Sequence, residues 1–290
     1  MKLLVLLLTP FILYAQSLSL QILGSGGPEF SKRASSSYII WIDNQAKVLV
    51  DAGGGAFLRF SQSAAKIEDL ELMALTHLHI DHSADIPAFM KAGYFSKRTD
   101  ILPILGTVKG GDFPNMATYL ERMFGKNGVY AYMQDILTPQ SDSFQIKPFV
   151  CGTEFQTQQF KNIKLTSVGV NHGKIPAIAY AFEIEGKKIV FAGDTSANSD
   201  KLIKLAKDAD YLIVHHAIPQ HAGAYAKRLH ITPKRIGEVA QKAKVKHLIL
   251  SHRMKRTYDS EAQSLKLIKE SYSGDIIWAE DMMKIDVKLR

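Results

Sequence analysis

The feature that most restricts what this chain can fold into is the run His77-Leu-His-Ile-Asp-His82, which follows the apolar segment Leu70–Leu75 after a single threonine. We expect Leu70–Leu75 to form a strand, so that His77 and His79, two positions apart on extended chain, point the same way and reach one metal ion. Asp81 and His82 follow as the chain turns into a helix, and they are directed at a second ion. Four ligand-type side chains within six residues would be costly to bury unpaired, so the run predicts a metal site.

Three later strand candidates also end at a side chain of a metal-binding type. They end at His172, Asp194 and His252, and the strands are Ile163–Val170, Lys187–Ala192 and His247–Leu250. In α/β proteins functional groups gather where strands end at one edge of a sheet, because the strand fixes the backbone while the loop leaves the side chain free. We therefore expect these side chains to meet those of the 77–82 run along one rim.

The rest of the pattern predicts an α/β fold in which strands and helices alternate. Further strands are expected at Leu18–Leu23, Ser37–Ile42, Lys47–Val50, Tyr211–Val214 and, as a pair or one long strand, Asp275–Val287. A hairpin joins Ala177–Glu185 to Lys187–Ala192, and helices are expected at Lys201–Asp208, Pro233–Lys244 and Glu261–Tyr272. Residues 83–150 indicate a helical and irregular insertion that covers the site, with mainly core aromatic and methionine side chains. The glycines of 24–28 and 53–55 indicate tight turns with positive φ, since neither run has the spacing of a phosphate-binding loop.

The first residues have the pattern of a secretory signal peptide. Lys2 supplies a positive charge, an apolar run extends from Leu3 to Leu13, and Ala15 or Ser17 provides a small residue for cleavage. The run is too short to span a membrane, for which about 20 apolar residues are needed. We expect a signal peptide at 1–17, a mature domain at 18–290, a periplasmic or secreted protein, and no stable membrane insertion.

Composition excludes some functions and favours others. A single cysteine, Cys151, rules out an intramolecular disulfide, and we expect it to be a small buried side chain. The net charge of +8 favours an anionic substrate or an anionic envelope surface. The lysines are scattered rather than arranged in a basic stripe with aromatics, so we expect no nucleic-acid partner.

The metal-site motifs also carry a resemblance to a known family. The 77–82 run, followed in order by His172, Gly193-Asp194-Thr195 and Ser251-His252, resembles the metallo-β-lactamase superfamily. Leu23–Pro28, Asp51–Gly55 and His230-Ile-Thr232 resemble, more narrowly, its ribonuclease Z-like and metal-dependent arylsulfatase branch. The resemblance extends over residues 18–287 and implies a four-layer αββα fold, with two sheets between layers of helices.

The resemblance further implies how the ligands divide between two ions. His77, His79 and His172 would hold one ion, Asp81, His82 and His252 the other, and Asp194 would bridge them. Nitrogen and oxygen ligands with three histidines on one ion suit zinc, so we expect two Zn²⁺ per chain. Two such ions produce a bridging hydroxide nucleophile at neutral pH. Asp81 would orient it, and His230 would protonate the leaving group or stabilise an oxyanion.

The leading functional hypothesis is an exported binuclear zinc hydrolase that cleaves a small anionic ester, either an aryl sulfate or a phosphodiester. The stretch from His82 to Phe95 slightly favours the arylsulfatase-like branch. Only 21 residues separate His172 from Asp194, too few for the tRNA-gripping arm that a ribonuclease Z resemblance would require. A homodimer is one candidate assembly.

Three alternatives remain open beside that hypothesis. A β-lactamase-like amide hydrolase is disfavoured because β-lactamases of this fold lack a bridging aspartate such as Asp194. A mononuclear iron dioxygenase and a non-catalytic binding module are the other two. Of the remaining histidines, His215, His216 and His221 are weaker candidates for the substrate site, and His247, which opens a strand, is taken as structural.

Overall fold

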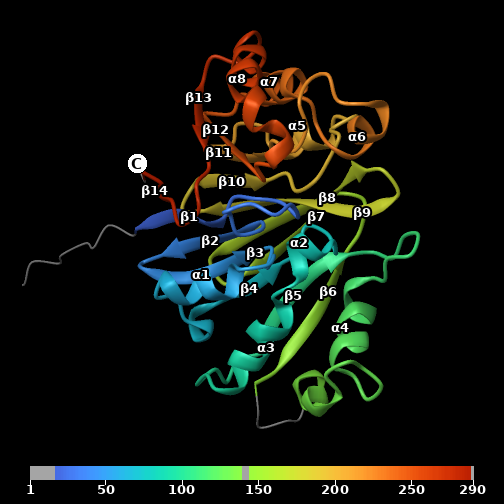
Figure 1. The fold of residues 1–290 in the computed structure, drawn as a ribbon. Helices are drawn as coiled ribbons and strands as arrows, with labels where there is room; N and C mark the ends of the chain where they lie inside the picture. Colours follow the sequence, from blue (N-terminus) through green and yellow to red (C-terminus); the bar gives the residue numbers. More distant parts are fainter. Residues whose placement is uncertain (1–16, 139–143, 289–290) are drawn as a thin grey trace, which may run out of the picture.

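Two seven-stranded sheets pack face to face in this computed structural model, which describes residues 17–138 and 144–288 (Figure 1). The expected signal peptide at 1–17 lies outside the described residues, apart from Ser17. The first sheet has the order β14-β1-β2-β3-β4-β5-β6, with β1 Leu18–Gly24, β2 Ser37–Ile42, β3 Gln45–Val50, β4 Leu72–Ala74, β5 Leu102–Thr107, β6 Ile146–Cys151 and β14 Lys284–Asp286. The second has the order β13-β12-β11-β10-β9-β8-β7, with β7 Gln156–Phe160, β8 Ile163–His172, β9 Ile175–Ile184, β10 Lys187–Phe191, β11 Tyr211–His215, β12 His247–Ser251 and β13 Asp275–Trp278.

Helices cover the outer face of each sheet, which confirms the four-layer αββα fold (Figure 1). The first sheet carries α1 (Ala56–Gln62), α2 (Ile80–Ser83), α3 (Ile86–Tyr94) and α4 (Met116–Phe124), with the short 3₁₀ helices η1 (Ile67–Asp69) and η2 (Ala131–Leu137). The second carries α5 (Lys201–Leu205), α6 (Ala224–Leu229), α7 (Pro233–Lys242) and α8 (Glu261–Lys269), with η3 (Lys255–Ser260). No helix among the described residues has the length and apolar character needed to cross a membrane.

The inner strands, such as β1, β2 and β11, are buried on both faces, and their side chains divide between two apolar layers with the period of two that a strand imposes. On β2, Tyr38 and Ile40 point into the cluster between the sheets, while Ile39 and Trp41 pack under the helices of the first sheet. On β9, Tyr180 points between the sheets and Ala181 toward α5 and α7. This packing fixes both sheets, and so it also fixes where their strands end.

The segment 83–150 differs from the expected helical insertion. It contains α3 and α4, but it also contributes β5 and β6, which extend the first sheet in parallel with β4. Both strands contain a proline, Pro103 and Pro148, and β5 contains a glycine, so their sequences lack the alternation that indicates a strand. The polar edge strand β7, Gln-Thr-Gln-Gln-Phe, was missed because it carries almost no apolar side chain.

The C-terminal segment Asp275–Val287 forms two strands that belong to different sheets. β13 pairs with β12 in parallel, and β14 pairs with β1 antiparallel. The chain therefore crosses from one sheet to the other after β13, and it closes the edge of the first sheet. The hairpin between β9 and β10 is as expected, with positive φ at Glu185 and Gly186, as a two-residue turn of this kind requires.

Candidate metal centre

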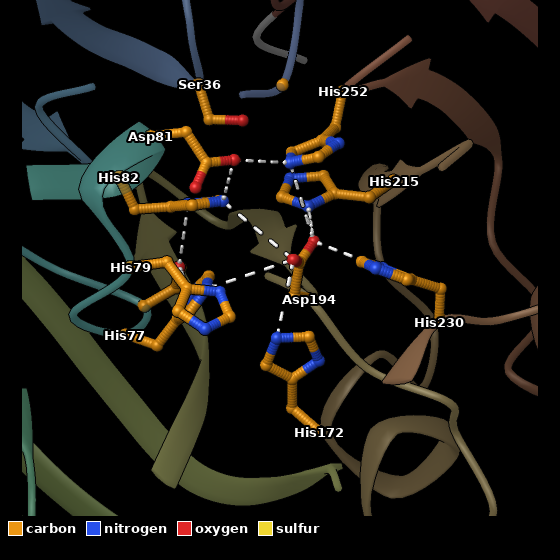
Figure 2. Close-up of polar contacts among 12 residues, drawn as sticks. Ser36, His77, His79, Asp81, His82, His172, Asp194, His215, His230 and His252 are labelled. Carbon is orange, nitrogen blue, oxygen red and sulfur yellow. Dashed lines mark hydrogen bonds and ion pairs between the residues drawn. The ribbon is translucent and has the colours of Figure 1, made fainter. Parts of the chain in front are cut away.

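Histidine and aspartate side chains from four strand ends converge at one rim between the two sheets (Figure 2). The 77–82 run follows β4 and forms α2, His172 is the last residue of β8, Asp194 follows β10, and His252 follows β12. The expectation that the strand ends bring these side chains together is therefore confirmed. The arrangement arises because β4, β8, β10 and β12 are all held in the packed core, and only their ends are free to present polar groups.

The ligand-type atoms fall into two groups that share Asp194. One group contains His77, His79, His172 and Asp194, and the other contains His82, Asp194, His215 and His252. Within each group the ligand atoms all lie within 4.8 Å of one another. Asp81 belongs beside the second group, because its Oδ2 lies 3.0 Å from His252 Nε2 and 3.5 Å from His82 Nε2. Asp194 is thus the one carboxylate common to both groups within the described part of the chain.

The distances from Asp194 to histidines of both groups are those that bound metal ions require. Asp194 Oδ2 lies 3.6 Å from His172 Nε2, 3.8 Å from His77 Nε2 and 4.0 Å from His82 Nε2. Two ligand atoms bound to one zinc ion at tetrahedral angles lie about 3.4 Å apart, since each bond is about 2.0–2.1 Å long. The distances are therefore too long for hydrogen bonds but close to those between ligands of one ion.

Unpartnered nitrogen atoms support the same conclusion. Nε2 of His77, His82 and His172 is buried and has no hydrogen-bond partner among the described residues. The opposite ring nitrogen of two of them is held, because His172 Nδ1 donates to the Leu229 carbonyl at 2.7 Å and His82 Nδ1 lies 2.8 Å from Asp51 Oδ2. A buried nitrogen with no partner is costly unless something binds it. The residues fit a metal ion, and the cluster is a metal-binding one.

Asp51 is a functional residue that the sequence analysis did not assign to the site. It follows β3, it is fully buried, and its carboxylate accepts hydrogen bonds from Thr76 N at 2.7 Å and Thr76 Oγ1 at 2.9 Å as well as contacting His82. It therefore fixes the ring of His82 in the way that carboxylates orient metal-binding histidines. The signal was present, because Asp51 ends a predicted strand at the same rim as the ligands.

His215 contacts Asp194 directly and orients its carboxylate. From the sequence, His215 was only a weak candidate for the substrate site. Its Nδ1 lies 2.7 Å from Asp194 Oδ1, and its Nε2 lies 3.4 Å from Tyr38 Oη. Both of its ring nitrogens thus have partners, unlike the Nε2 atoms of His77 and His172. Burial lowers the pKa of His215 to about 4, so the ring is neutral. We therefore assign His215 to the orientation of Asp194 rather than to direct metal binding.

The two carboxylates of the centre are held in their ionised forms. Burial alone would raise the pKa of Asp194, but the surrounding histidines, with His252 and His215 foremost, lower it well below its usual value. Burial likewise opposes ionisation of Asp81, yet its contacts with His252 and His82 lower its pKa to about 2. For His82, burial is outweighed by Asp51, which raises the pKa of the ring to about 9. The ionised Asp194 and Asp81 thus place negative charge beside the unpartnered nitrogens of His172 and His82.

His230 lies at the edge of the centre, at the C-terminal end of α6. Its Nδ1 is buried, has no hydrogen-bond partner in the described part of the chain, and lies 3.7 Å from Asp194 Oδ1. Burial lowers the pKa of His230 to about 3, so the ring is neutral at pH 7. A neutral imidazole donates a hydrogen bond, and this state suits the oxyanion-stabilising role better than the proton-donor role.

The other three histidines take no direct part in the ligand groups. His216 is buried, and neither of its ring nitrogens has a hydrogen-bond partner among residues 17–138 and 144–288. Its ring packs edge-on against Trp278, with the ring centroids 5.0 Å apart. His221 is exposed in the loop before α6. His247 pairs with Asp275 across β12 and β13 and stacks on Tyr211, in agreement with a structural role.

The glycines near the centre are needed mainly because other groups of the chain approach their Cα atoms closely. The sequence had instead predicted tight turns with positive φ at these positions. Of the two runs, only Gly55 has a positive φ, at 92°. A Cβ atom at Gly27 would lie 2.5 Å from His252 Cε1, and one at Gly53 would lie 2.1 Å from the Asp81 carbonyl oxygen. These loops are therefore glycine-rich because the backbone packs directly on two ligand residues.

The segment 83–150 supplies one aromatic contact to the centre. Phe113 meets the ring of His79 edge-on with centroids 5.5 Å apart. Most of the segment's other large apolar side chains are core, including Phe89 and Phe124, whereas Phe95 and Tyr132 are exposed. Cys151 is buried, as expected, and lies 3.9 Å from Tyr180 Oη.

Comparison with known proteins identifies relatives of this architecture. The family model described as the β-lactamase superfamily domain matches residues 46–253. A ribonuclease Z of Mycobacterium bovis is 25% identical over 291 residues, which cover 94% of this chain and 99% of that protein. Among solved structures, the metallo-β-lactamase fold protein YhfI from Bacillus subtilis has a TM-score of 0.75 at 19% identity, covering 94% of this chain and 100% of that one. Human tRNase Z, short form, has a TM-score of 0.71 at 20% identity, with 94% and 99% covered.

Proposed function

This chain belongs to the β-lactamase superfamily, and on that premise we propose that it is a binuclear zinc hydrolase that cleaves phosphodiester bonds. The observation that carries the proposal is the shared position of Asp194 between two groups of ligand-type atoms. Two zinc ions in these groups would supply an activated water at neutral pH and offset the charge that develops during attack. Bound ions would also satisfy the buried Nε2 atoms of His77, His82 and His172.

We propose a phosphodiester rather than an aryl sulfate as the substrate because of the relatives that the comparisons identify. The matching protein from Mycobacterium bovis is named a ribonuclease Z, an activity on RNA, which speaks against the expectation that nucleic acid is no partner. The 21 residues between His172 and Asp194 form the hairpin of β9 and β10 with its short connections, so the arm discussed above has no counterpart there. We therefore propose a nucleotide or short RNA segment as the substrate. Aryl sulfate cleavage stays a prediction from the 82–95 stretch alone.

Two side chains of this protein would assist the reaction beside the metal ions. Asp81, ionised and held by His252, is placed to accept a hydrogen bond from the attacking water and to orient it. His230, neutral and at the edge of the centre, is placed to donate a hydrogen bond to the oxygen that gains charge. We also propose export to the periplasm or the medium, supported only by the sequence of residues 1–17.

A substrate panel with zinc-loaded protein tests the reaction class. It contains an aryl phosphodiester, an aryl sulfate, a cyclic nucleotide, a short RNA and a β-lactam. We expect turnover of the phosphodiesters that stops when a chelator removes the metal. Turnover of the β-lactam or the aryl sulfate alone would refute the phosphodiester assignment.

Replacement of His230 by alanine tests its role separately. We expect kcat on phosphodiesters to fall by about 100- to 1,000-fold, the usual effect of removing one hydrogen-bond donor to a developing oxyanion. Zinc content should stay that of the wild type, because His230 is not among the ligand groups. Rates measured over aryl leaving groups of different pKa distinguish the two roles. A steeper dependence on leaving-group pKa in H230A indicates proton donation, and an unchanged slope indicates oxyanion stabilisation. A kcat equal to that of the wild type would exclude both.

A further inference from the structure

A second cavity, of about 780 Å³, lies outside the metal centre. Its walls come from the loop after β1 and from η3, and they include Phe30, Lys32, Arg33, Lys255 and Tyr258. No ligand residue of the metal centre lines it. Its volume falls within the usual range of about 300–1,000 Å³ for small-molecule sites.

The charges around this cavity leave two cations without partners. Its two carboxylates are already engaged, because Glu280 binds Arg33 (Nη2–Oε1 3.1 Å) and Arg253, and Asp281 accepts from Ser25 N at 3.0 Å and Ala34 N at 2.8 Å. Asp281 also lies 3.6 Å from Arg59, a further wall residue.

By contrast, Lys32 and Lys255 form no ion pair or hydrogen bond with any residue that the structure describes. Both lysines line the cavity, where Glu280 and Asp281 are already neutralised by arginines. The cavity is therefore left with two cations suited to an anionic group such as phosphate.

Two aromatic side chains border the same space. Phe30 is fully exposed, with 103% of its reference surface accessible, which is unfavourable for a side chain of this size. Tyr258 is half-buried, and the Arg33 guanidinium lies over its ring, 5.9 Å from the centroid. Aromatic faces beside an arginine are surfaces on which planar bases stack.

We propose that this cavity is a second ligand site, separate from the metal centre, that takes a phosphorylated aromatic molecule of nucleotide size. The aromatic ring stacks on Phe30 or Tyr258, and the phosphate lies between Lys32 and Lys255. The site goes beyond the proposed hydrolysis, because a molecule held there needs no contact with a metal ion. Phe30, Lys32 and Arg33 belong to the same connection between β1 and β2 as Gly27, which packs on His252, so an occupied cavity would restrict the motion of that loop.

Calorimetric titration of the zinc-loaded protein with AMP, adenosine and inorganic phosphate tests the proposal. We expect AMP to bind more tightly than either part alone. Lys32→Ala/Lys255→Ala should weaken AMP binding roughly tenfold or more through lost charge-assisted contacts. Phe30→Ala should weaken it about 5- to 100-fold, the range for loss of one stacking contact, while leaving phosphate binding unchanged.

Matched controls separate this site from the rest of the surface and from the metal centre. Lys126→Ala/Lys242→Ala removes two exposed lysines elsewhere, and Phe95→Ala removes another exposed aromatic, so these variants should bind AMP as the wild type does. All variants should cleave bis(4-nitrophenyl) phosphate at the wild-type rate. AMP binding that is equal in the wild type and in K32A/K255A would place the ligand elsewhere and overturn the proposal, as would no AMP binding to the wild type. Lack of phosphodiester turnover would instead overturn the proposed reaction. The AMP titration would still test the second ligand site, because binding is measured independently of turnover.

Discussion

Asp194→Ala is expected to abolish phosphodiester turnover, with a fall in kcat of about a thousandfold or more. Asp194 is the carboxylate shared by both ligand groups, and its Oδ2 lies 3.6–4.0 Å from three histidine nitrogens. Without it neither ion has its full ligand set, so zinc per chain should fall as well. A thousandfold loss corresponds to about 4 kcal/mol of transition-state stabilisation, within the several kcal/mol that bound metal supplies.

The fold should survive this substitution. Alanine leaves the buried His215 Nδ1 without its acceptor, at a cost of about 1–3 kcal/mol, which is less than the usual stability of a domain. Far-ultraviolet circular dichroism, zinc content by mass spectrometry and kcat are the measurements. Asp200→Ala, which removes an exposed aspartate ahead of α5, is the control and should match the wild type. Wild-type turnover in D194A would refute the bridging role.

Asp51→Asn is expected to weaken zinc binding at the second group by about 10- to 100-fold, although Asp51 belongs to neither ligand group. Its carboxylate accepts from Thr76 N, Thr76 Oγ1 and His82 at once. An asparagine has one acceptor oxygen, so its amide group must face either Thr76 or His82 as a donor. The His82 ring would then lose the contact that orients it toward Asp194.

The same substitution should lower the stability of the metal-free protein by about 3–5 kcal/mol, because it breaks a fully buried charged pair. Zinc affinity by competition with a chromophoric chelator and the free energy of unfolding in urea are the measurements. Asp200→Asn, the same exchange at an exposed position ahead of α5, is the control and should leave both unchanged. Zinc affinity in D51N equal to that of the wild type would show that Asp51 acts on the fold alone.

The fold could be predicted wherever local pattern and packing agree. Strands such as β1, β2 and β12 are rich in apolar side chains and are bounded by turn residues, and their bounds were predicted within one or two residues. β5 and β6 were missed because Pro103 and Pro148 interrupt their patterns, although β5 lies inside the first sheet and pairs in parallel with the edge strand β6. Their strand conformation comes from pairing with β4 and with each other, which is a tertiary effect that a local pattern does not contain.

The sequence was enough to predict the candidate ligand residues, but not the residues that hold those ligands in place. Metal-binding side chains can be recognised in a sequence by their type and spacing, as in the 77–82 run. The roles of Asp51 and His215 depend on which nitrogen of a neighbouring ring they meet, and those contacts join residues 31 and 21 positions apart. Likewise Gly27 is explained only by the ring of His252 packed against it, far along the chain. Such contacts are set by the assembled sheets.

Anomalous diffraction at the zinc absorption edge, from crystals of the zinc-loaded protein, tests the central claim most directly. We expect two peaks, each about 2.0–2.2 Å from an oxygen of Asp194. One should also lie at bonding distance from His77, His79 and His172, and the other from Asp81, His82 and His252. A single peak, or two peaks of which neither contacts Asp194, would contradict a centre built on two ions joined by one carboxylate.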